Sequence, residues 1–232
     1  MPQGEKVQQL FDVIAPRYDL TNRLLSGGID LLWRRRLAAE VAACQPKAVV
    51  DLATGSGDVV FALRKKLGAA VALTGIDFCQ AMLDEAEQKK RRKGDVLTVF
   101  QQGDCLDLDL PDGCADVVTI SFGLRNLEDR HRGLQEMHRI LRKPNGVLLI
   151  LEFTQPAAWV RPFYSLYLKC GLPLIAALAT GEPGAYRYLT SSIRGFPNKG
   201  ALSDEIRQAG FQRVDVLSMT GSLVAIHRAQ VE

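Results

Sequence analysis

The feature that most constrains the fold is an alternation of apolar runs of strand length with amphipathic stretches of helix length, repeated from residue 47 to residue 153. Strands that alternate with helices form βαβ units, and such units build a parallel sheet that helices cover on both faces. The expected strands are residues 47–52, 71–77, 96–101, 115–121 and 146–153. The expected helices are residues 59–67, 80–92 and 130–141.

The C-terminal part follows a different pattern. Residues 213–219 and 222–227 have the character of two strands joined at Thr220-Gly221, after a last helix at 203–209. Two strands joined by so short a turn must be antiparallel to each other. We therefore expect one α/β domain of 232 residues, with a mostly parallel, Rossmann-like seven-stranded sheet and an antiparallel C-terminal strand pair.

Two segments fall outside the alternation, residues 1–45 and residues 154–200. In an open α/β sheet the ligand lies at the carboxyl ends of the strands, so we expect a helical N-terminal cap and a substrate-side insert at that edge. The aromatic residues of the insert either pack as an ordinary helical cap or line a pocket for a large apolar ligand. They are Trp159, Phe163, Tyr164, Tyr167, Tyr186 and Tyr188.

Cysteine usage and the termini bear on the compartment. The five cysteines are odd in number and show no metal-ligand spacing, which argues against a disulfide framework or a metal site and favours a reducing compartment. Residues 1–10 lack the apolar core of a signal peptide. The most apolar stretch, 171–180, is far shorter than the roughly 20 residues that span a bilayer, so a cytoplasmic protein is expected.

The net charge of +3 is too small to argue for a nucleic-acid partner. The basic residues nevertheless cluster in two runs, Arg34–Arg36 and Lys89–Lys93. Such runs are usually a solvated helix face. The alternative is a weak peripheral contact with the anionic inner face of a membrane, to which each basic residue contributes about 1 kcal/mol.

A glycine-rich loop joins the first expected strand to the first helix, Asp51-Leu-Ala-Thr-Gly-Ser-Gly-Asp58. Gly55 and Gly57 match the start of a dinucleotide-binding fingerprint, but Val60 stands at its third glycine. An acidic loop suits the cationic sulfonium of S-adenosylmethionine (SAM) and would repel a pyrophosphate. Asp51, Gly55 and Gly57 are therefore candidate SAM contacts.

Polar residues end the next three strands as well. Asp77 is placed to accept both ribose hydroxyls, or else to cap the following helix. Asp104 is placed to accept from the adenine amine, with the Cys105 N–H bonding a ring nitrogen, or else to cap its own loop. Ser121 ends the fourth strand, where its hydroxyl faces the same crevice.

Four segments make the resemblance specific. The chain resembles the ubiquinone/menaquinone biosynthesis C-methyltransferase family over about residues 10–227. The matching segments are Tyr18-Asp-Leu-Thr-Asn22 with Trp33-Arg34, Ser121-Phe-Gly-Leu-Arg-Asn126, Arg139 to Thr154, and Tyr186-Arg-Tyr-Leu189 with Ser192-Ile-Arg194. One departure concerns the N-terminal segment, where Asp30 stands in place of the family's usual histidine.

The resemblance implies a class I SAM-dependent methyltransferase fold and methylation of a ring carbon of a prenylated quinol, with demethylmenaquinol favoured over a benzoquinol. It does not decide the oligomeric state, so a homodimer stays open. The positions that match the family's SAM contacts are Ser56, Asp77, Asp104, Cys105 and Ser121.

The catalytic candidates are Arg125 and Asn126. A permanent cation suits a developing phenolate, although Arg125 is also able to tie its loop to a nearby carboxylate. Gly123 is expected to let the chain turn there. Weaker candidates for substrate binding are Tyr18, Asp19, Tyr186 and Arg187, of which the tyrosines also suit ordinary cap packing.

Two other functions remain as alternatives. A small-molecule O- or N-methyltransferase of the same fold would have a compact, polar cap, which this chain lacks. A dinucleotide-binding oxidoreductase or a non-catalytic binding module would differ in its ligand, because it would not bind SAM.

Overall fold

The computed structural model describes residues 18–167 and 183–232, with only the backbone described at residues 163, 164, 166, 183–187 and 189. Cys170, the apolar stretch 171–180 and the first seventeen residues of the predicted cap lie outside the described residues.

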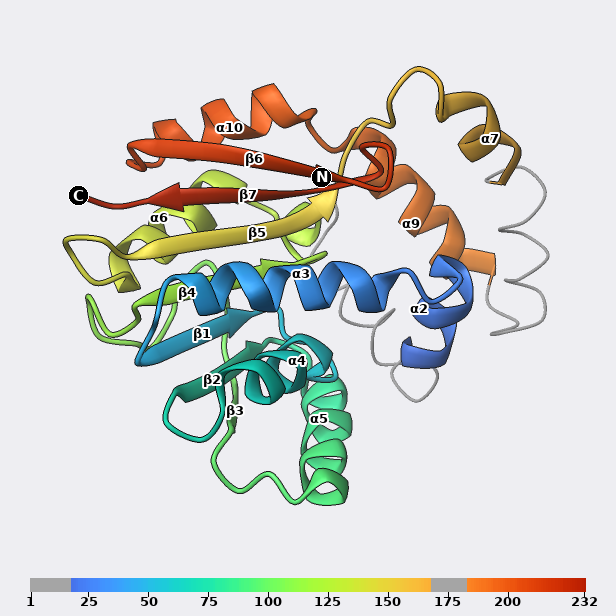
Figure 1. Ribbon diagram of the computed structural model, residues 1–232. Coiled ribbons are helices and arrows are strands. Elements are labelled where there is room, and N and C mark those ends of the chain that lie inside the picture. Colours follow the sequence, from blue (N-terminus) through green and yellow to red (C-terminus); the bar gives the residue numbers. More distant parts are fainter. Residues whose placement is uncertain (1–17, 168–182) are drawn as a thin grey trace.

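The core of the fold is one seven-stranded sheet with the strand order β3-β2-β1-β4-β5-β7-β6 (Figure 1). All neighbouring strands are parallel except that β7 runs antiparallel to both β5 and β6. The strands are β1 (Ala48–Leu52), β2 (Ala72–Asp77), β3 (Val99–Gln102), β4 (Val117–Ser121), β5 (Val147–Phe153), β6 (Arg213–Met219) and β7 (Val224–Gln230). The predicted sheet is confirmed.

Helices cover both faces of the sheet. The helices of the described residues are α2 (Tyr18–Ser26), α3 (Asp30–Ala43), α4 (Asp58–Leu67), α5 (Gln80–Lys93), α6 (Arg130–Ile140), α7 (Arg161–Leu166), α9 (Pro183–Gly195) and α10 (Lys199–Gln208), with a short 3-10 helix, η2 (Leu124–Asn126). Side chains of α6 and α10 pack on one face of the central strands, and side chains of α3 and α4 pack on the other. Because successive strand residues point to opposite faces, each central strand contributes to both layers.

The predicted N-terminal cap is helical where the structure describes it, but α3 belongs to the core. Trp33, Leu37 and Val41 are buried against the sheet, together with Val49 and Leu149. Their spacing of four residues puts them on one stripe of the helix. Helix α2, by contrast, lies beyond the carboxyl ends of the strands, as Figure 1 shows.

Several element boundaries differ from the prediction. β3 begins at Val99 and not at 96, because the Asp95 carboxylate accepts the N–H groups of Leu97 and Thr98 and folds them into a turn. Helix α10 begins four residues early, after Asn198, whose side chain caps it. The last strand runs to Gln230, because its pairing with β5 continues that far.

Candidate active site

The glycine loop leaves β1 at the carboxyl edge of the sheet, as predicted. Gly55 and Gly57 have φ angles of +56° and +80°, which residues with a side chain rarely adopt. A Cβ on Gly57 would also lie 2.8 Å from the ring of Phe100. The loop is fixed at its tip, since Gly55 N–H donates to Asp77 Oδ2 over 2.7 Å.

Asp51 lies beneath this loop as a buried carboxylate. Its oxygens accept the hydroxyls of Thr54 at 2.7 Å and Thr119 at 2.5 Å. Burial raises the pKa of Asp51 to about 6, although both hydroxyl donors oppose the shift. The group is therefore poised to change charge near neutral pH, in a wall of the cavity described below.

Asp77 ends β2, where it binds backbone groups with both oxygens. In addition to Gly55 N–H, it accepts Cys79 N–H at 3.0 Å. Burial raises the pKa of Asp77 despite these donors. The Asp77 carboxylate therefore holds the turn into α5. Each of its oxygens keeps a further lone pair that could accept a ribose hydroxyl, so the predicted contact with ribose stays a prediction.

Asp104 and Cys105 follow β3. The Asp104 side chain is exposed and accepts Leu106 N–H at 2.9 Å, the loop-capping contact that was the alternative for this residue. The Cys105 thiol is buried, and burial raises its pKa to about 12. In the strand order, these two residues and Asp77 belong to the β2–β3 side of the glycine loop.

The turn after β4 differs from the prediction in its detail. The left-handed conformation falls on Phe122, with φ +55°, and not on Gly123. Glycine is required at 123 for a close approach, because a Cβ there would lie 2.5 Å from Cβ of Ala53 in the glycine loop. Ser121 Oγ, just before the turn, is buried and has no hydrogen-bond partner within the described part of the chain.

Arg125 stands in η2 and forms a buried ion pair with Glu152 of β5. Its Nη1 lies 3.0 and 3.1 Å from the two carboxylate oxygens, and the side chains are only 6% and 1% exposed. Burial raises the pKa of Glu152, although the arginine opposes the shift. The alternative in which Arg125 ties its loop to a carboxylate is therefore realised, while Arg125 still lines the cavity.

Asn126, the second catalytic candidate, contacts α9. Its Oδ1 accepts the hydroxyl of Tyr188 at 2.9 Å, and burial raises the pKa of that phenol. Tyr186 and Arg187 belong to the same helix, but their side chains lie outside the described part of the structure.

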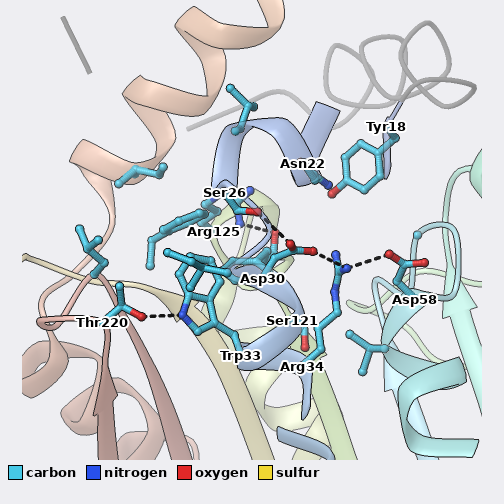
Figure 2. Close-up of a pocket in the computed structure, with 18 of the residues that line it drawn as sticks. Tyr18, Asn22, Ser26, Asp30, Trp33, Arg34, Asp58, Ser121, Arg125 and Thr220 are labelled. Atoms are coloured by element: carbon cyan, nitrogen blue, oxygen red, sulfur yellow. Dashed lines mark hydrogen bonds and ion pairs between the residues drawn. The ribbon is translucent and has the colours of Figure 1, made fainter. Parts of the chain in front are cut away.

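A cavity of about 540 Å³ lies over the carboxyl ends of β1, β4 and β5, beneath α2 and the start of α3 (Figure 2). Its walls include six of the predicted site residues: Tyr18, Asp51, Gly55, Ser56, Ser121 and Arg125. The rest of the lining is largely apolar and comes mainly from α2, α3, the glycine loop, the start of α4, the ends of β4 and β5, α9 and the β6–β7 turn. It also includes the charged side chains of Asp30, Arg34 and Asp58.

Aromatic rings form one wall of the cavity. Phe122 and Phe153 lie 4.8 Å apart between ring centroids, and Trp33 packs at 5.9 Å from Phe122. Trp33 Nε1 donates to Thr220 Oγ1 at 2.8 Å, which fixes the indole against the β6–β7 turn. This wall suits a flat apolar ring.

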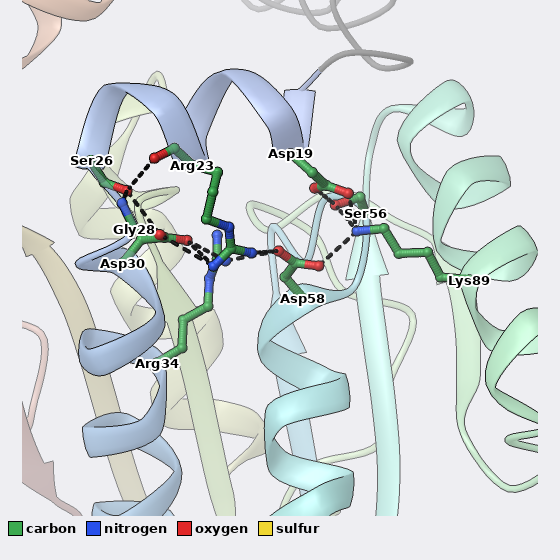
Figure 3. A network of polar contacts seen from close by, with 9 residues as sticks. All are labelled: Asp19, Arg23, Ser26, Gly28, Asp30, Arg34, Ser56, Asp58 and Lys89. Atoms are coloured by element: carbon green, nitrogen blue, oxygen red, sulfur yellow. Dashed lines mark hydrogen bonds and ion pairs between the residues drawn. The ribbon is translucent and has the colours of Figure 1, made fainter.

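A polar network joins the N-terminal helices to the glycine loop (Figure 3). Arg34, almost fully buried, bridges Asp30 at 2.6 Å and Asp58 at 2.8 Å. Asp30 also accepts Ser26 Oγ at 2.8 Å. Burial alone would raise the pKa of Asp58, but the surrounding cations, Arg34 first, hold it below its usual range.

Asp19 meets the glycine loop in the same network. Its carboxylate accepts Ser56 Oγ at 2.5 Å and forms an ion pair with Lys89. Lys89 also donates to Ser56 Oγ at 2.9 Å and to Asp58 at 2.7 Å. Asp19, a substrate candidate in the sequence, is thus brought to the loop expected to hold the cofactor.

The interpretation of the basic runs as solvated helix faces is wrong for two of their members. Arg34 is buried, and the Lys89 side chain is 16% exposed within the network. Both stabilise carboxylates that hold the edge of the site together.

Sequence reasoning missed several residues of this site. Glu152 had a usable signal, because it is a lone carboxylate inside the apolar strand Val147–Phe153. Asp58 and Lys89 had only the general signal of charged residues, since their partners are distant in sequence.

The fold and the site define the class. A glycine loop after β1, an acid after β2 and this strand order are those of SAM-dependent methyltransferases. A solved structure from Thermotoga maritima, described as a SAM-dependent methyltransferase and possible histamine N-methyltransferase, matches with a TM-score of 0.63. The match covers 97% of this chain and 99% of that chain at 16% identity, and it shows the fold.

The chain belongs to the ubiE/COQ5 methyltransferase family, since the sequence model of that family matches residues 2–231. A demethylmenaquinone methyltransferase of Deinococcus radiodurans is 44% identical over 90% of this chain and 86% of that protein. A ubiquinone/menaquinone biosynthesis C-methyltransferase UbiE of Geotalea uraniireducens is 36% identical over 97% of this chain and 96% of that protein.

Proposed function

We propose that this protein transfers a methyl group from SAM to a ring carbon of a prenylated quinol, with demethylmenaquinol as the substrate. The observation that carries the proposal is the largely apolar, aromatic-walled cavity that lies directly beside the glycine loop. The names of the relatives from Deinococcus radiodurans and Geotalea uraniireducens support the same substrate class.

The residues at the glycine loop fit SAM. Asp51 and Asp77 surround the loop with carboxylates, which favour a cationic ligand. The buried Ser121 hydroxyl has no hydrogen-bond partner among the described residues, so it offers a hydrogen bond to a ligand. Residues proposed to hold the cofactor are Asp51, Gly55, Ser56, Gly57, Asp77, Asp104, Cys105 and Ser121. When bound, SAM supplies an electrophilic methyl group on its sulfonium.

Arg125 is proposed to act on the substrate oxygen. Its Nη1 is engaged by Glu152, whereas its Nε is buried without a hydrogen-bond partner among the described residues. A guanidinium beside the quinol hydroxyl would lower the pKa of that hydroxyl and stabilise the phenolate, which pushes electron density onto the ring carbon. Stabilisation that grows as the anion forms raises kcat more than it tightens ground-state binding.

The remaining proposed roles are positioning ones. The wall of Trp33, Phe122 and Phe153 would orient the ring, which matters because carbon, methyl and sulfur must align. Asn126 is proposed to fix η2 against α9 through Tyr188. Tyr18, Asp19, Tyr186 and Arg187 stay weaker candidates for contact with the substrate.

The location of the protein follows from the proposed substrate. None of the helices in the described part of the chain is long and apolar enough to cross a membrane. We propose a cytoplasmic protein with a peripheral contact at the inner face of the membrane, where a prenylated quinol resides. A homodimer stays an untested prediction.

The test is methyl transfer with the purified protein, deuterated-methyl SAM and chemically reduced acceptors. Demethylmenaquinol with a short tail should gain a labelled methyl group on the ring, and faster than a demethylated benzoquinol. Labelling of small phenols or amines, with none of either quinol, would instead favour the O- or N-methyltransferase alternative. No SAM binding by calorimetry would refute the whole assignment.

A further inference from the structure

Five large apolar side chains of the two described N-terminal helices and the turn between them are exposed to solvent. Leu20 and Leu24 of α2, Ile29 between the helices, and Leu31 and Leu32 of α3 are between 39% and 59% exposed. We call these five residues the α2–α3 apolar surface. Single exposed leucines need no explanation, but a group on two adjoining helices marks an interaction site.

This surface is continuous with the cavity. Leu24 and Ile29 are exposed to solvent and also line the cavity, so they stand at its mouth. The apolar lining therefore passes from the aromatic wall to the outside of α2 and α3 through these two residues.

The charges of the two helices leave a basic residue beside the surface. Their carboxylates are all ion-paired, namely Asp19 with Lys89, Asp30 with Arg34, and Glu40 with Arg36. Arg35 is exposed and forms no ion pair within the part of the chain that the structure describes. It lies three and four residues after Leu32 and Leu31, so it shares their side of α3.

We propose that the α2–α3 apolar surface inserts into the interface of an anionic membrane leaflet, with Arg35 among the headgroups, so that the cavity mouth opens onto lipid. This inference rests on the proposed function, because a prenylated quinol is dissolved in the bilayer. Apolar side chains flanked by a cation are what an interfacial helix presents to anionic lipid. In the basic run of α5, Lys89 is not available for this purpose, since it is held inside the molecule.

The test uses a matched pair of double variants. Leu31→Asp with Leu32→Asp changes the surface and leaves the cavity lining intact, since neither residue lines it. Val96→Asp with Leu97→Asp makes the same change of charge at residues 85% and 49% exposed, in the turn before β3. Binding is measured by flotation with vesicles of equal parts phosphatidylcholine and phosphatidylglycerol, and melting temperatures confirm that each variant is folded.

We expect the 31/32 variant to bind these vesicles at least about tenfold more weakly than the wild type, and the 96/97 variant within about twofold of it. Arg35→Gln should weaken binding severalfold on these vesicles and leave binding to pure phosphatidylcholine unchanged. Equal vesicle binding by the 31/32 and 96/97 variants would overturn the proposal. Loss of a dimer in the 31/32 variant, with vesicle binding intact, would assign the surface to a second copy.

An activity measurement separates this inference from the proposed function. With a short-tailed quinol in buffer, the 31/32 variant should match the wild-type kcat, whereas with a long-tailed quinol in vesicles it should fall. If the wild type methylates neither quinol, the proposed function fails. The flotation experiment then still tests whether the α2–α3 apolar surface binds vesicles. If the 31/32 variant keeps wild-type turnover on the long-tailed quinol in vesicles, the membrane inference fails alone.

Discussion

Replacing Arg125 by Met should destabilise the fold because of the ion pair that it forms. Arg125 and Glu152 are 6% and 1% exposed, and one guanidinium nitrogen lies 3.0 and 3.1 Å from the two carboxylate oxygens. Removing one member of a buried pair strands the other charge, at a cost of about 3–5 kcal/mol. For a chain of this length, that corresponds to a fall in melting temperature of roughly 6–20 °C.

Glu152→Gln in the same chain should recover most of this loss. The double variant removes both charges, and replacing a buried pair by uncharged groups is often close to neutral, so we expect it within about 1–2 kcal/mol of the wild type. In the single Arg125→Met variant, the pKa of Glu152 should rise further above its unfolded value. Its deficit should therefore shrink as the pH falls toward that pKa and grow as the pH rises.

Urea unfolding monitored by circular dichroism measures the free energies, and methyl transfer on the same samples measures kcat. The proposed catalytic role predicts that the double variant regains its stability but stays about 10²-fold slower in kcat, with near-normal SAM binding. A single Arg125→Met variant that loses less than about 0.5 kcal/mol would refute the buried pair. Recovery of both stability and kcat in the double variant would show that Arg125 has only a structural role, namely to hold its loop against Glu152.

Three further predictions concern the cofactor side of the site. Asp77→Ala should lower SAM affinity at least tenfold by calorimetry with the fold intact, because hydrogen bonds to a charged group contribute about 1.5–3 kcal/mol each; unchanged affinity would leave Asp77 a turn residue. Burial raises the Asp51 pKa to about 6, so its contribution to stability is largest below its unfolded pKa and is lost as the pH rises through 6. In urea unfolding, Asp51→Asn should therefore gain stability relative to the wild type by up to about 3 kcal/mol between pH 4 and pH 7, and a pH-independent difference would contradict this. Lys89→Met should weaken SAM binding severalfold and lower the melting temperature, whereas Arg92→Met, in the same basic run but exposed, should do neither; equal effects would show that only net charge matters.

Local signals account for what the sequence predicted well. The strands are apolar runs, and the glycine loop needs left-handed backbone at Gly55 and Gly57. Both features can therefore be recognised from the residue types alone. The turn at Asp95 was missed because Val96 and Leu97 are apolar, although a side-chain hydrogen bond pulls that stretch out of the strand. Apolar character alone does not tell a strand from a turn that exposes its side chains.

Tertiary contacts account for the rest. Arg125 and Glu152 belong to segments that both matched the family, but only the pairing of β4 with β5 places the two side chains together. The same holds for Asp19 and Lys89, which meet at the glycine loop from two different helices. The sequence shows that these residues are charged, but it does not show which residues form ion pairs with them.

The most direct test of the central claim is the dependence of methyl transfer on the redox state of the acceptor. The purified protein receives deuterated-methyl SAM and a short-tailed demethylmenaquinone, either reduced with borohydride or left oxidised, and the products are analysed by mass spectrometry. The ring of the reduced quinol is rich in electrons, so the account predicts a labelled methyl group on a ring carbon in the reduced sample and essentially none in the oxidised one. Equal labelling of the oxidised quinone, or a label found on oxygen, would contradict it.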